Sequence, residues 1–231
     1  MIEEKISYLQ KNISLICQRL GKNPEEITLV AVTKFAPVEQ IKQAIDCGLI
    51  HIGENKVQEA QKKFPLLRPA NPNLVCHLIG HLQTNKVKSA LQVCDLLQSI
   101  DSFKLASEVE RQAENLGREV DILLQVNTSG EQQKFGVERS QAIPLIKKIA
   151  QLRRVHVRGL MTIAPLNGVE TVIRQCFRSL REVRDEAVEK FSGGENVDMK
   201  YLSMGMTQDY PIALEEGANM LRIGTAIFEK A

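Results

Sequence analysis

The sequence lacks the features that would place it in a membrane, on a secretory route or on a polyanion. None of its apolar runs approaches the roughly 18 residues that a transmembrane helix requires. Its start, MIEEKISYLQKN, has acidic residues where a secretory signal needs a basic and then an apolar stretch. There is little excess charge of either sign, since 30 Lys and Arg residues stand against 28 Asp and Glu residues, so no net field favours a nucleic acid or an anionic membrane. We therefore expect a soluble, unprocessed protein whose partner is a small molecule.

Cysteines are few, odd in number and scattered. No C-x-x-C pair is present, and all but the first lie among apolar neighbours. This usage predicts reduced, buried thiols in a cytoplasmic protein. The five are Cys17, Cys47, Cys76, Cys94 and Cys176.

What the sequence does contain is a repeated alternation of strand and helix patterns. Apolar residues line one helical face over residues 2–20, until Gly21 and Pro24 end that pattern. Eight short apolar runs of strand length follow, at residues 27–33, 49–53, 74–80, 95–100, 120–127, 156–164, 198–204 and 219–224. Helical spacing lies between them at residues 37–47, 54–64, 83–92, 102–116, 138–152, 169–191 and 207–216, and a last helix begins near Ala226. Asp101 and Gly117 are the predicted caps of the helix over residues 102–116.

Most of the runs are apolar at both alternating positions, which is typical of parallel strands covered by helices. Eight strand–helix units in 231 residues favour an α/β fold, a single (β/α)8 TIM-like barrel with an extra N-terminal helix. No linker divides the chain, so residues 1–231 are predicted to form one domain. An open doubly wound sheet is the alternative.

Arginines recur at three- and four-residue spacing in the helix over residues 169–191. They could form a docking surface, but acidic residues lie among them, which favours an ordinary solvated helix face. These arginines are Arg174, Arg178, Arg181 and Arg184.

Lys34 is the first candidate for chemistry, because it directly follows the first apolar run. The working face of a TIM-like barrel is the carboxyl end of its strands. We expect partial burial there, which disfavours the ammonium form and leaves an amine that can condense with an aldehyde. A strand-end lysine that only extends to solvent is the alternative.

The last two strand ends carry a candidate phosphate site, since barrels often bind phosphate after strands seven and eight. Ser203 and Gly205 follow the seventh run, and Gly224 and Thr225 the eighth, so each end offers a glycine and a hydroxyl beside a helix start. Arg222 lies within the eighth run. If it points into the barrel mouth, it can only donate hydrogen bonds, for example to an unprotonated ring nitrogen.

Two further groupings are weaker. His77 and His81 have a metal-like spacing, but they straddle a strand end without nearby Cys or acidic ligands, so no metal site is predicted. Asn127, Glu131 and Lys134 fall in the loop after the fifth run, again at the mouth, where turn formation around glycines explains them equally well.

Six segments together give the sequence its resemblance to a known family. They are VAVTK at 30–34, HIGENK at 51–56, HLIGHLQTNK at 77–86, GLMTIAP at 159–165, LSMGMTQDY at 202–210 and LRIGTAIF at 221–228. This ordered set covers nearly the whole chain and resembles the pyridoxal phosphate (PLP) homeostasis proteins. The chain departs from that pattern at Cys76, where an aromatic residue is common, and at Glu229, where a glycine is usual.

The resemblance implies a single barrel like the N-terminal domain of alanine racemase, with PLP as its cofactor. It makes Lys34 the Schiff-base lysine and Arg222 the partner of the pyridine nitrogen. It assigns the phosphate to the four residues at the last two strand ends. It further implies that Asn55 borders the cofactor, that Met161 packs near its ring, and that Lys134 is a second acceptor for PLP.

The same resemblance implies buffering, delivery or sensing of PLP, with effects on amino-acid pools and with apo PLP-dependent enzymes as candidate partners, and no established catalysis. An arginine at the pyridine nitrogen keeps it unprotonated, which disfavours the electron-sink chemistry of PLP enzymes. We therefore expect a monomeric cofactor-binding protein rather than an enzyme. The alternatives are a low-activity PLP-dependent amino-acid racemase and a Schiff-base aldolase that does not use PLP.

Overall fold

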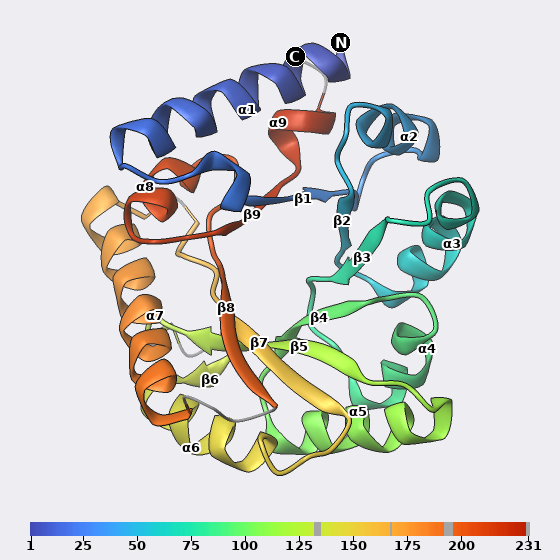
Figure 1. Ribbon diagram of the computed structural model, residues 1–231, viewed down its shortest axis with the longest axis vertical. Coiled ribbons are helices and arrows are strands. Elements are labelled where there is room, and N and C mark those ends of the chain that lie inside the picture. Colours follow the sequence, from blue (N-terminus) through green and yellow to red (C-terminus); the bar gives the residue numbers. More distant parts are fainter. Residues whose placement is uncertain (132–134, 167, 192–195, 230–231) are drawn as a thin grey trace.

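The computed structural model describes residues 1–131, 135–166, 168–191 and 196–229, and within them the main sheet is a closed parallel barrel (Figure 1). The strand order is β4-β3-β2-β1-β9-β8-β7-β5, and a further pairing of β4 with β5 closes the ring. The closed barrel is confirmed and the open sheet is excluded, because a doubly wound sheet would leave both of these edges unpaired. The strands are β1 (Thr28–Val32), β2 (His51–Glu54), β3 (Val75–Leu78), β4 (Leu96–Ile100), β5 (Val120–Asn127), β7 (Val155–Met161), β8 (Val197–Ser203) and β9 (Met220–Ile223).

All eight predicted strands are confirmed, with small differences at their ends. One element was missed: the two-residue strand β6 (Val137–Glu138) pairs with the end of β5. Its length is too short to give a detectable period in the sequence.

Helices surround the barrel in Figure 1. They are α1 (Ile2–Arg19), α2 (Val38–Asp46), α3 (Val57–Leu67), α4 (Val87–Leu91), α5 (Phe103–Leu116), α6 (Arg139–Ile149), α7 (Glu170–Phe191), α8 (Tyr210–Glu215) and α9 (Thr225–Phe228). Short 3-10 turns cover Pro24–Glu26, Arg68–Ala70 and Thr84–Lys86. The helix predicted from residue 54 begins only at Val57, and the helix predicted from residue 207 begins only at Tyr210. In neither α1 nor α7, the described helices of 18 residues or more, is there an apolar window that could cross a membrane.

The predicted caps of α5 are half right. Gly117 ends the helix in the left-handed conformation, with φ 64°, as expected. The N-cap is Ser102 rather than Asp101, because the Ser102 hydroxyl accepts a hydrogen bond from the Leu105 N–H at 3.3 Å. Asp101 instead places Oδ2 3.7 Å from His81 Nδ1.

Strand side chains alternate between two environments, as a pleated barrel requires. One face of each strand joins the large apolar core beneath the helices, as Ala31, Leu97 and Leu221 do. The other face points into the barrel, where Val30 and Met220 belong to a smaller apolar cluster. The positions that face inward therefore decide what the barrel can hold.

The arginine row of α7 is not the simply solvated helix face that the sequence favoured. Three of its members converge on the buried Glu216, which is 4% exposed. The shortest distances to its carboxylate oxygens are 3.2 Å from Arg174, 3.2 Å from Arg178 and 3.0 Å from Arg181. Burial raises the pKa of Glu216, but the arginines outweigh it and the net pKa is lowered. The fourth member, Arg184, pairs with Asp185 at 2.6 Å, and Arg174 also contacts Glu170 on its own helix at 2.7 Å.

We expect Glu216→Gln to lower the free energy of unfolding by roughly 2 kcal/mol, the scale of a hydrogen bond to a charged group. Because the folded-state pKa is lowered, this contribution is present above the ordinary carboxyl pKa and is lost as the pH falls through the folded value. Urea titrations at pH 7 and at acidic pH measure it. Glu182→Gln, whose partner Arg139 is half exposed, is the control and should change little.

Candidate functional site

A cavity of about 340 Å³ lies at the carboxyl ends of β1 and β9, beneath the loops that follow β7 and β8. Its volume is that of a small-molecule site. Lys34, Arg222, Gly224 and Thr225, all singled out from the sequence, line it. The remaining lining residues are Val32, Pro165, Leu166, Gly168, Ile173, Met206, Thr207, Gln208 and Asp209.

Lys34 lies in a turn just past β1 and its side chain is exposed, so the predicted partial burial is wrong. The strand ends at Val32, and the turn at residues 34 and 35 carries the lysine out of the barrel wall. Its ammonium nitrogen lies 5.0 Å from the ring centroid of Phe35. The amine therefore stands at the edge of the cavity, where a ligand can reach it.

Arg222 is buried at the base of this cavity and is 3% exposed. One terminal nitrogen donates to Ser203 Oγ at 2.7 Å, and the other donates to the Thr162 carbonyl at 2.8 Å. Burial lowers the pKa of the guanidinium to about 10, against the opposing effect of Asp209, so the group stays charged at neutral pH. A guanidinium has five N–H groups and these bonds use two, so the fork retains donors for a ligand.

Thr207 is a cavity residue that the sequence reasoning missed. Its Oγ1 accepts hydrogen bonds from the Thr225 hydroxyl at 2.8 Å and from the Ala226 N–H at 3.3 Å. Because both contacts use its oxygen as acceptor, its own hydrogen is available to donate. It falls within the LSMGMTQDY segment and could have been found if residues 207–209 had been assigned to the loop before α8 rather than to the helix.

Ser203 and Gly205 do not line the cavity, which departs from the predicted phosphate site. Ser203 is fully buried, and its hydroxyl bonds to Gln98 and Arg222 inside the barrel. Gly205 has φ +94°, and a Cβ there would lie 2.6 Å from Ala213 Cβ. The Gly205 carbonyl accepts a hydrogen bond from the Arg222 backbone N–H at 3.0 Å. Ser203 and Gly205 therefore hold Arg222 in position without lining the cavity themselves.

Two other predicted positions, Asn55 and Met161, do not line the cavity. Asn55 is exposed after β2, and its backbone packs so closely on Gly80 that no Cβ fits there. Met161 is fully buried in the inward cluster with Leu123. Lys134 lies outside the described residues.

The two weaker groupings, the loop after β5 and the histidine pair, do not form a site together among the described residues. Asn127 Nδ2 donates to the Glu131 carbonyl at 2.8 Å, which closes their own loop. His77 points into the barrel, whereas His81 stacks on Phe135 with ring centroids 3.9 Å apart. No group of three potential metal ligands occurs within the part of the chain that the structure describes.

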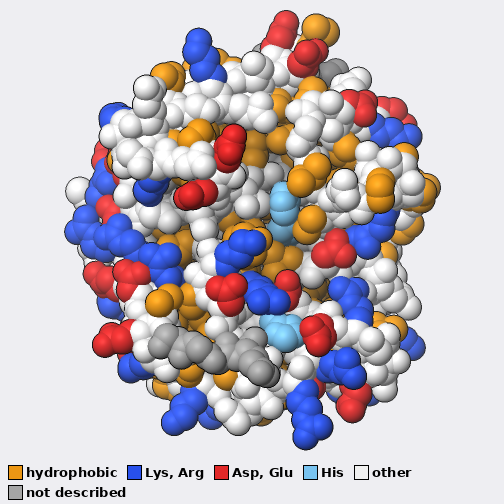
Figure 2. Space-filling view, viewed as in Figure 1, with side chains coloured by type: hydrophobic (Ala, Val, Ile, Leu, Met, Phe, Trp, Pro, Cys, Tyr) orange, Lys and Arg blue, Asp and Glu red, His pale blue; other side chains and the backbone are white. Residues whose placement is uncertain are grey.

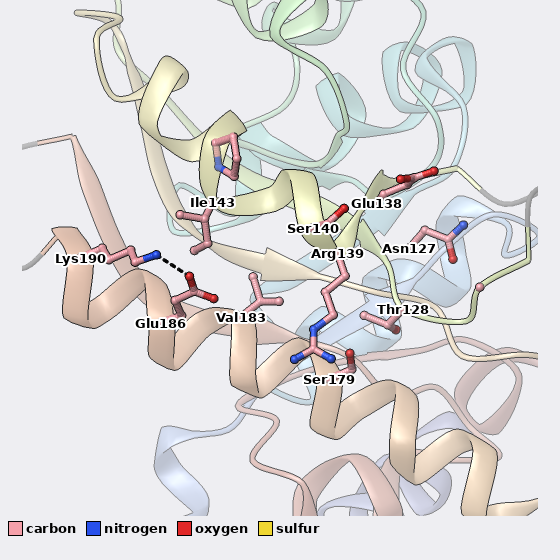
Figure 3. A pocket seen from close by; sticks show the side chains of 12 residues that line it. Asn127, Thr128, Glu138, Arg139, Ser140, Ile143, Ser179, Val183, Glu186 and Lys190 are labelled. Atoms are coloured by element: carbon pink, nitrogen blue, oxygen red, sulfur yellow. Dashed lines mark hydrogen bonds and ion pairs between the residues drawn. The ribbon is translucent and has the colours of Figure 1, made fainter.

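A larger cavity of about 830 Å³ lies elsewhere, between α6 and α7 (Figure 3). Three of its charged side chains are already engaged: Lys190 bonds to Glu186 at 2.6 Å and Arg139 to Glu182 at 2.7 Å. It contains none of the predicted cofactor residues, so the smaller cavity at the barrel mouth is the candidate site.

The chain matches the family model of the alanine racemase N-terminal domain over residues 5–230. A crystal structure of an unknown protein from Bifidobacterium adolescentis superimposes on it with a TM-score of 0.94 at 36% identity, covering 98% of this chain and 94% of that one. The fold and the site thus define a barrel of the alanine racemase N-terminal-domain type.

Two relatives narrow this class. The pyridoxal phosphate homeostasis protein of Aquifex aeolicus is 39% identical over 225 residues, which is 97% of this chain and 96% of that protein. PipY of Synechococcus elongatus, in its structure with PLP bound, gives a TM-score of 0.85 at 33% identity and covers 99% of this chain and 100% of that one. The chain belongs to the pyridoxal phosphate homeostasis protein family, as its sequence segments indicated.

Proposed function

We propose that this chain binds PLP in the cavity at the barrel mouth and holds it as a Schiff base on Lys34. The observation that carries the proposal is that the Lys34 amine and the Arg222 guanidinium line one small cavity. An amine can condense with the aldehyde of PLP, and a buried donor-only group can bind its pyridine nitrogen.

The phosphate is assigned to the hydroxyl pair of Thr225 and Thr207, together with the backbone at Gly224. All three residues line the cavity. Gly224 and Thr225 lie at the start of α9, and Thr207, in the loop before α8, is hydrogen-bonded to Thr225. Hydroxyl and backbone N–H donors suit a phosphate oxygen. Ser203 and Gly205 take an indirect part, because they hold Arg222 in place.

The site is suited to holding the cofactor rather than to catalysis. PLP supplies an electron sink when its pyridine nitrogen is protonated by an acidic partner. Arg222 cannot supply that proton. Apart from Lys34 and Arg222, Asp209 is the one ionisable side chain among the described lining residues, and its Oδ1 accepts the Met206 N–H at 2.5 Å. We therefore propose buffering, delivery or sensing of PLP.

The proposed recipients of the PLP are apo PLP-dependent enzymes. We propose that this chain acts as a monomer and that the transfer takes place in the cytoplasm. Leu166, which is 76% exposed, lines the cavity, and Phe35, which is 86% exposed, contacts the Lys34 ammonium, so apolar surface is available at the site. The five cysteines form no disulfide bonds with one another in the described residues, which suits a reducing compartment. Transfer of PLP to an apo-enzyme and light scattering test the recipient and the oligomeric state.

We expect purified protein incubated with PLP to show a visible absorbance band that borohydride removes, and Lys34→Ala to show none. The reason is that only a Schiff base on the Lys34 amine links the cofactor covalently. Lys42→Ala, an exposed lysine on α2, is the matched control and should keep the band. A band retained in Lys34→Ala would place the cofactor elsewhere.

The same preparation distinguishes the alternative functions. Racemisation of an amino acid at an ordinary enzyme rate would make the protein a racemase. A colourless protein that borohydride inactivates only in the presence of a carbonyl substrate would favour the aldolase.

A further inference from the structure

Five inward-facing side chains form one hydrogen-bonded line through the barrel. Arg222 contacts Ser203 Oγ at 2.7 Å, and Ser203 Oγ contacts Gln98 Oε1 at 2.7 Å. Gln98 Nε2 contacts His77 Nδ1 at 2.8 Å, and His77 Nε2 contacts His51 Nδ1 at 3.0 Å. The line starts at the cavity and ends at the first residue of β2, the opposite end of that strand from the barrel mouth.

The four members nearest the cavity are buried, and only the last, His51, is partly exposed. The face in Figure 2 shows histidine side chains near its centre, with hydrophobic side chains beside the upper one and acidic side chains beside the lower one. Barrel interiors are usually filled with branched apolar residues. A polar line in this position requires every member to be satisfied, because an unpaired polar group at this depth is costly.

The chemistry of the members fixes the direction of every bond in the line. Arg222 can only donate, so Ser203 Oγ accepts from it and passes its own hydrogen to Gln98 Oε1. The orientation of the Gln98 amide is also set by the Met220 sulfur, an acceptor that lies 3.3 Å from Nε2. Gln98 therefore donates to His77 Nδ1.

These bond directions also determine which ring nitrogens of His77 and His51 carry a hydrogen. His77 accepts at Nδ1, so its hydrogen is on Nε2 and it donates to His51 Nδ1. Burial lowers the pKa of His77 to about 3, which keeps this ring neutral. If His51 were protonated, its Nδ1–H would face the Nε2–H of His77, and two donors cannot form a hydrogen bond. The hydrogen-bonded line is therefore intact only when His51 is neutral.

The surroundings of His51 hold few groups that could compensate for that proton. Its neighbours in register are Val30 on β1 and Val75 on β3, both apolar. Besides His77, the group that acts on it is the Lys200 ammonium of β8, a like charge. Burial first, and then Lys200, lowers the pKa of His51.

We infer that His51 is a positioning residue for the ligand site: while neutral, it fixes the donor order that holds Arg222, and its protonation weakens binding at the cavity. The identity of the ligand, but not the existence of the line, rests on the proposed PLP function. Coupling between sites is reciprocal, so a ligand bound at Arg222 must in turn disfavour protonation of His51.

The test combines imidazole NMR with PLP titrations. In the ligand-free wild type, nitrogen shifts should place the His77 hydrogen on Nε2. PLP should move the His51 titration to lower pH. As the pH falls through the His51 titration, PLP affinity should drop about fivefold more in the wild type than in His51→Gln. A fivefold change is at the low end of the coupling usually found between two sites. His51→Gln keeps an acceptor for His77 but cannot take up a proton.

Ser203→Ala removes the hydroxyl that links Arg222 to Gln98 and so interrupts the line between the cavity and His51. In this variant, PLP should no longer shift the His51 titration. A His77 hydrogen found on Nδ1, or a His51 titration unchanged by PLP in the wild type, overturns the inference, and both measurements use the unmutated protein. If the wild type binds no PLP at all, the proposed function fails, while the His77 hydrogen position still decides the donor order.

Discussion

Replacing Lys63 with methionine is expected to lower the free energy of unfolding by about 3 kcal/mol or more, the cost of leaving a buried charge without its partner. Lys63 and Glu54 are 9% and 1% exposed, and Lys63 Nζ lies 2.7 Å from Glu54 Oε1. The second carboxylate oxygen of Glu54 has no hydrogen-bond partner among the described residues. Removing Lys63 would therefore leave the carboxylate with the Thr33 hydroxyl as its remaining partner. Urea unfolding with a constant m-value measures the loss.

The same ion pair supports the cavity. Lys63 Nζ donates to the Thr33 carbonyl at 2.7 Å, and the Thr33 hydroxyl donates to Glu54 Oε1 at 2.8 Å. Thr33 immediately precedes Lys34. Loss of Lys63 should therefore also reduce the fraction of protein that forms the Schiff base, as the visible band reports.

Lys62→Met is the matched control on the same helix. Lys62 bonds to Glu59 at 2.9 Å, but its side chain is 72% exposed, so its loss should cost no more than about 0.5 kcal/mol. The double variant Glu54→Leu with Lys63→Met should recover part of the stability, because it removes both buried charges. Equal stability of the two single lysine variants would contradict the account.

Replacing Arg222 with methionine is expected to weaken PLP binding by roughly 10- to 100-fold, because a charged hydrogen-bond donor contributes on the order of 1.5–3 kcal/mol. Methionine retains apolar bulk but no donor. It also leaves the Thr162 carbonyl and Ser203 Oγ without the hydrogen bonds they receive. Absorbance titration with PLP, followed by borohydride trapping, gives the affinity.

Arg158→Met serves as the comparison, since Arg158 also lies on a barrel strand, β7, but pairs with Asp121 at 2.8 Å and does not line the cavity. It should leave PLP affinity unchanged. Arg222→Lys should fall between the wild type and the methionine variant, because an ammonium keeps the charge but not the planar fork. An Arg222→Met protein that folds and binds PLP as tightly as the wild type would remove Arg222 from the site.

The sequence predicted the elements well because short apolar runs and punctuating turns are local signals. All eight long strands and the cap at Gly117 followed from them. The boundaries near residues 54 and 207 were less accurate, since both predicted helices included polar residues that precede the first helical turn: the chain is extended at Lys56, and residues 207–209 form a turn. The N-cap at Ser102 could not be separated from Asp101 by residue type alone, because both are good caps.

The site was predicted in part, for a similar reason. Lys34, Arg222, Gly224 and Thr225 meet because parallel strands bring their carboxyl ends to one edge. Ser203 comes at the end of a strand too, but strand alternation turns its hydroxyl into the barrel.

By itself, then, the sequence determined the order of strands and helices, the family segments and the residues that stand at strand ends, all of which depend on neighbours along the chain. Only the tertiary structure decided which side chains meet. Gln98, His77 and His51 join Arg222 because the register and closure of the barrel bring separate strands together. Glu216, at the end of α8, meets three arginines of α7 because these two helices pack against each other. Such contacts depend on distances between strands and helices, which no local pattern in the sequence records.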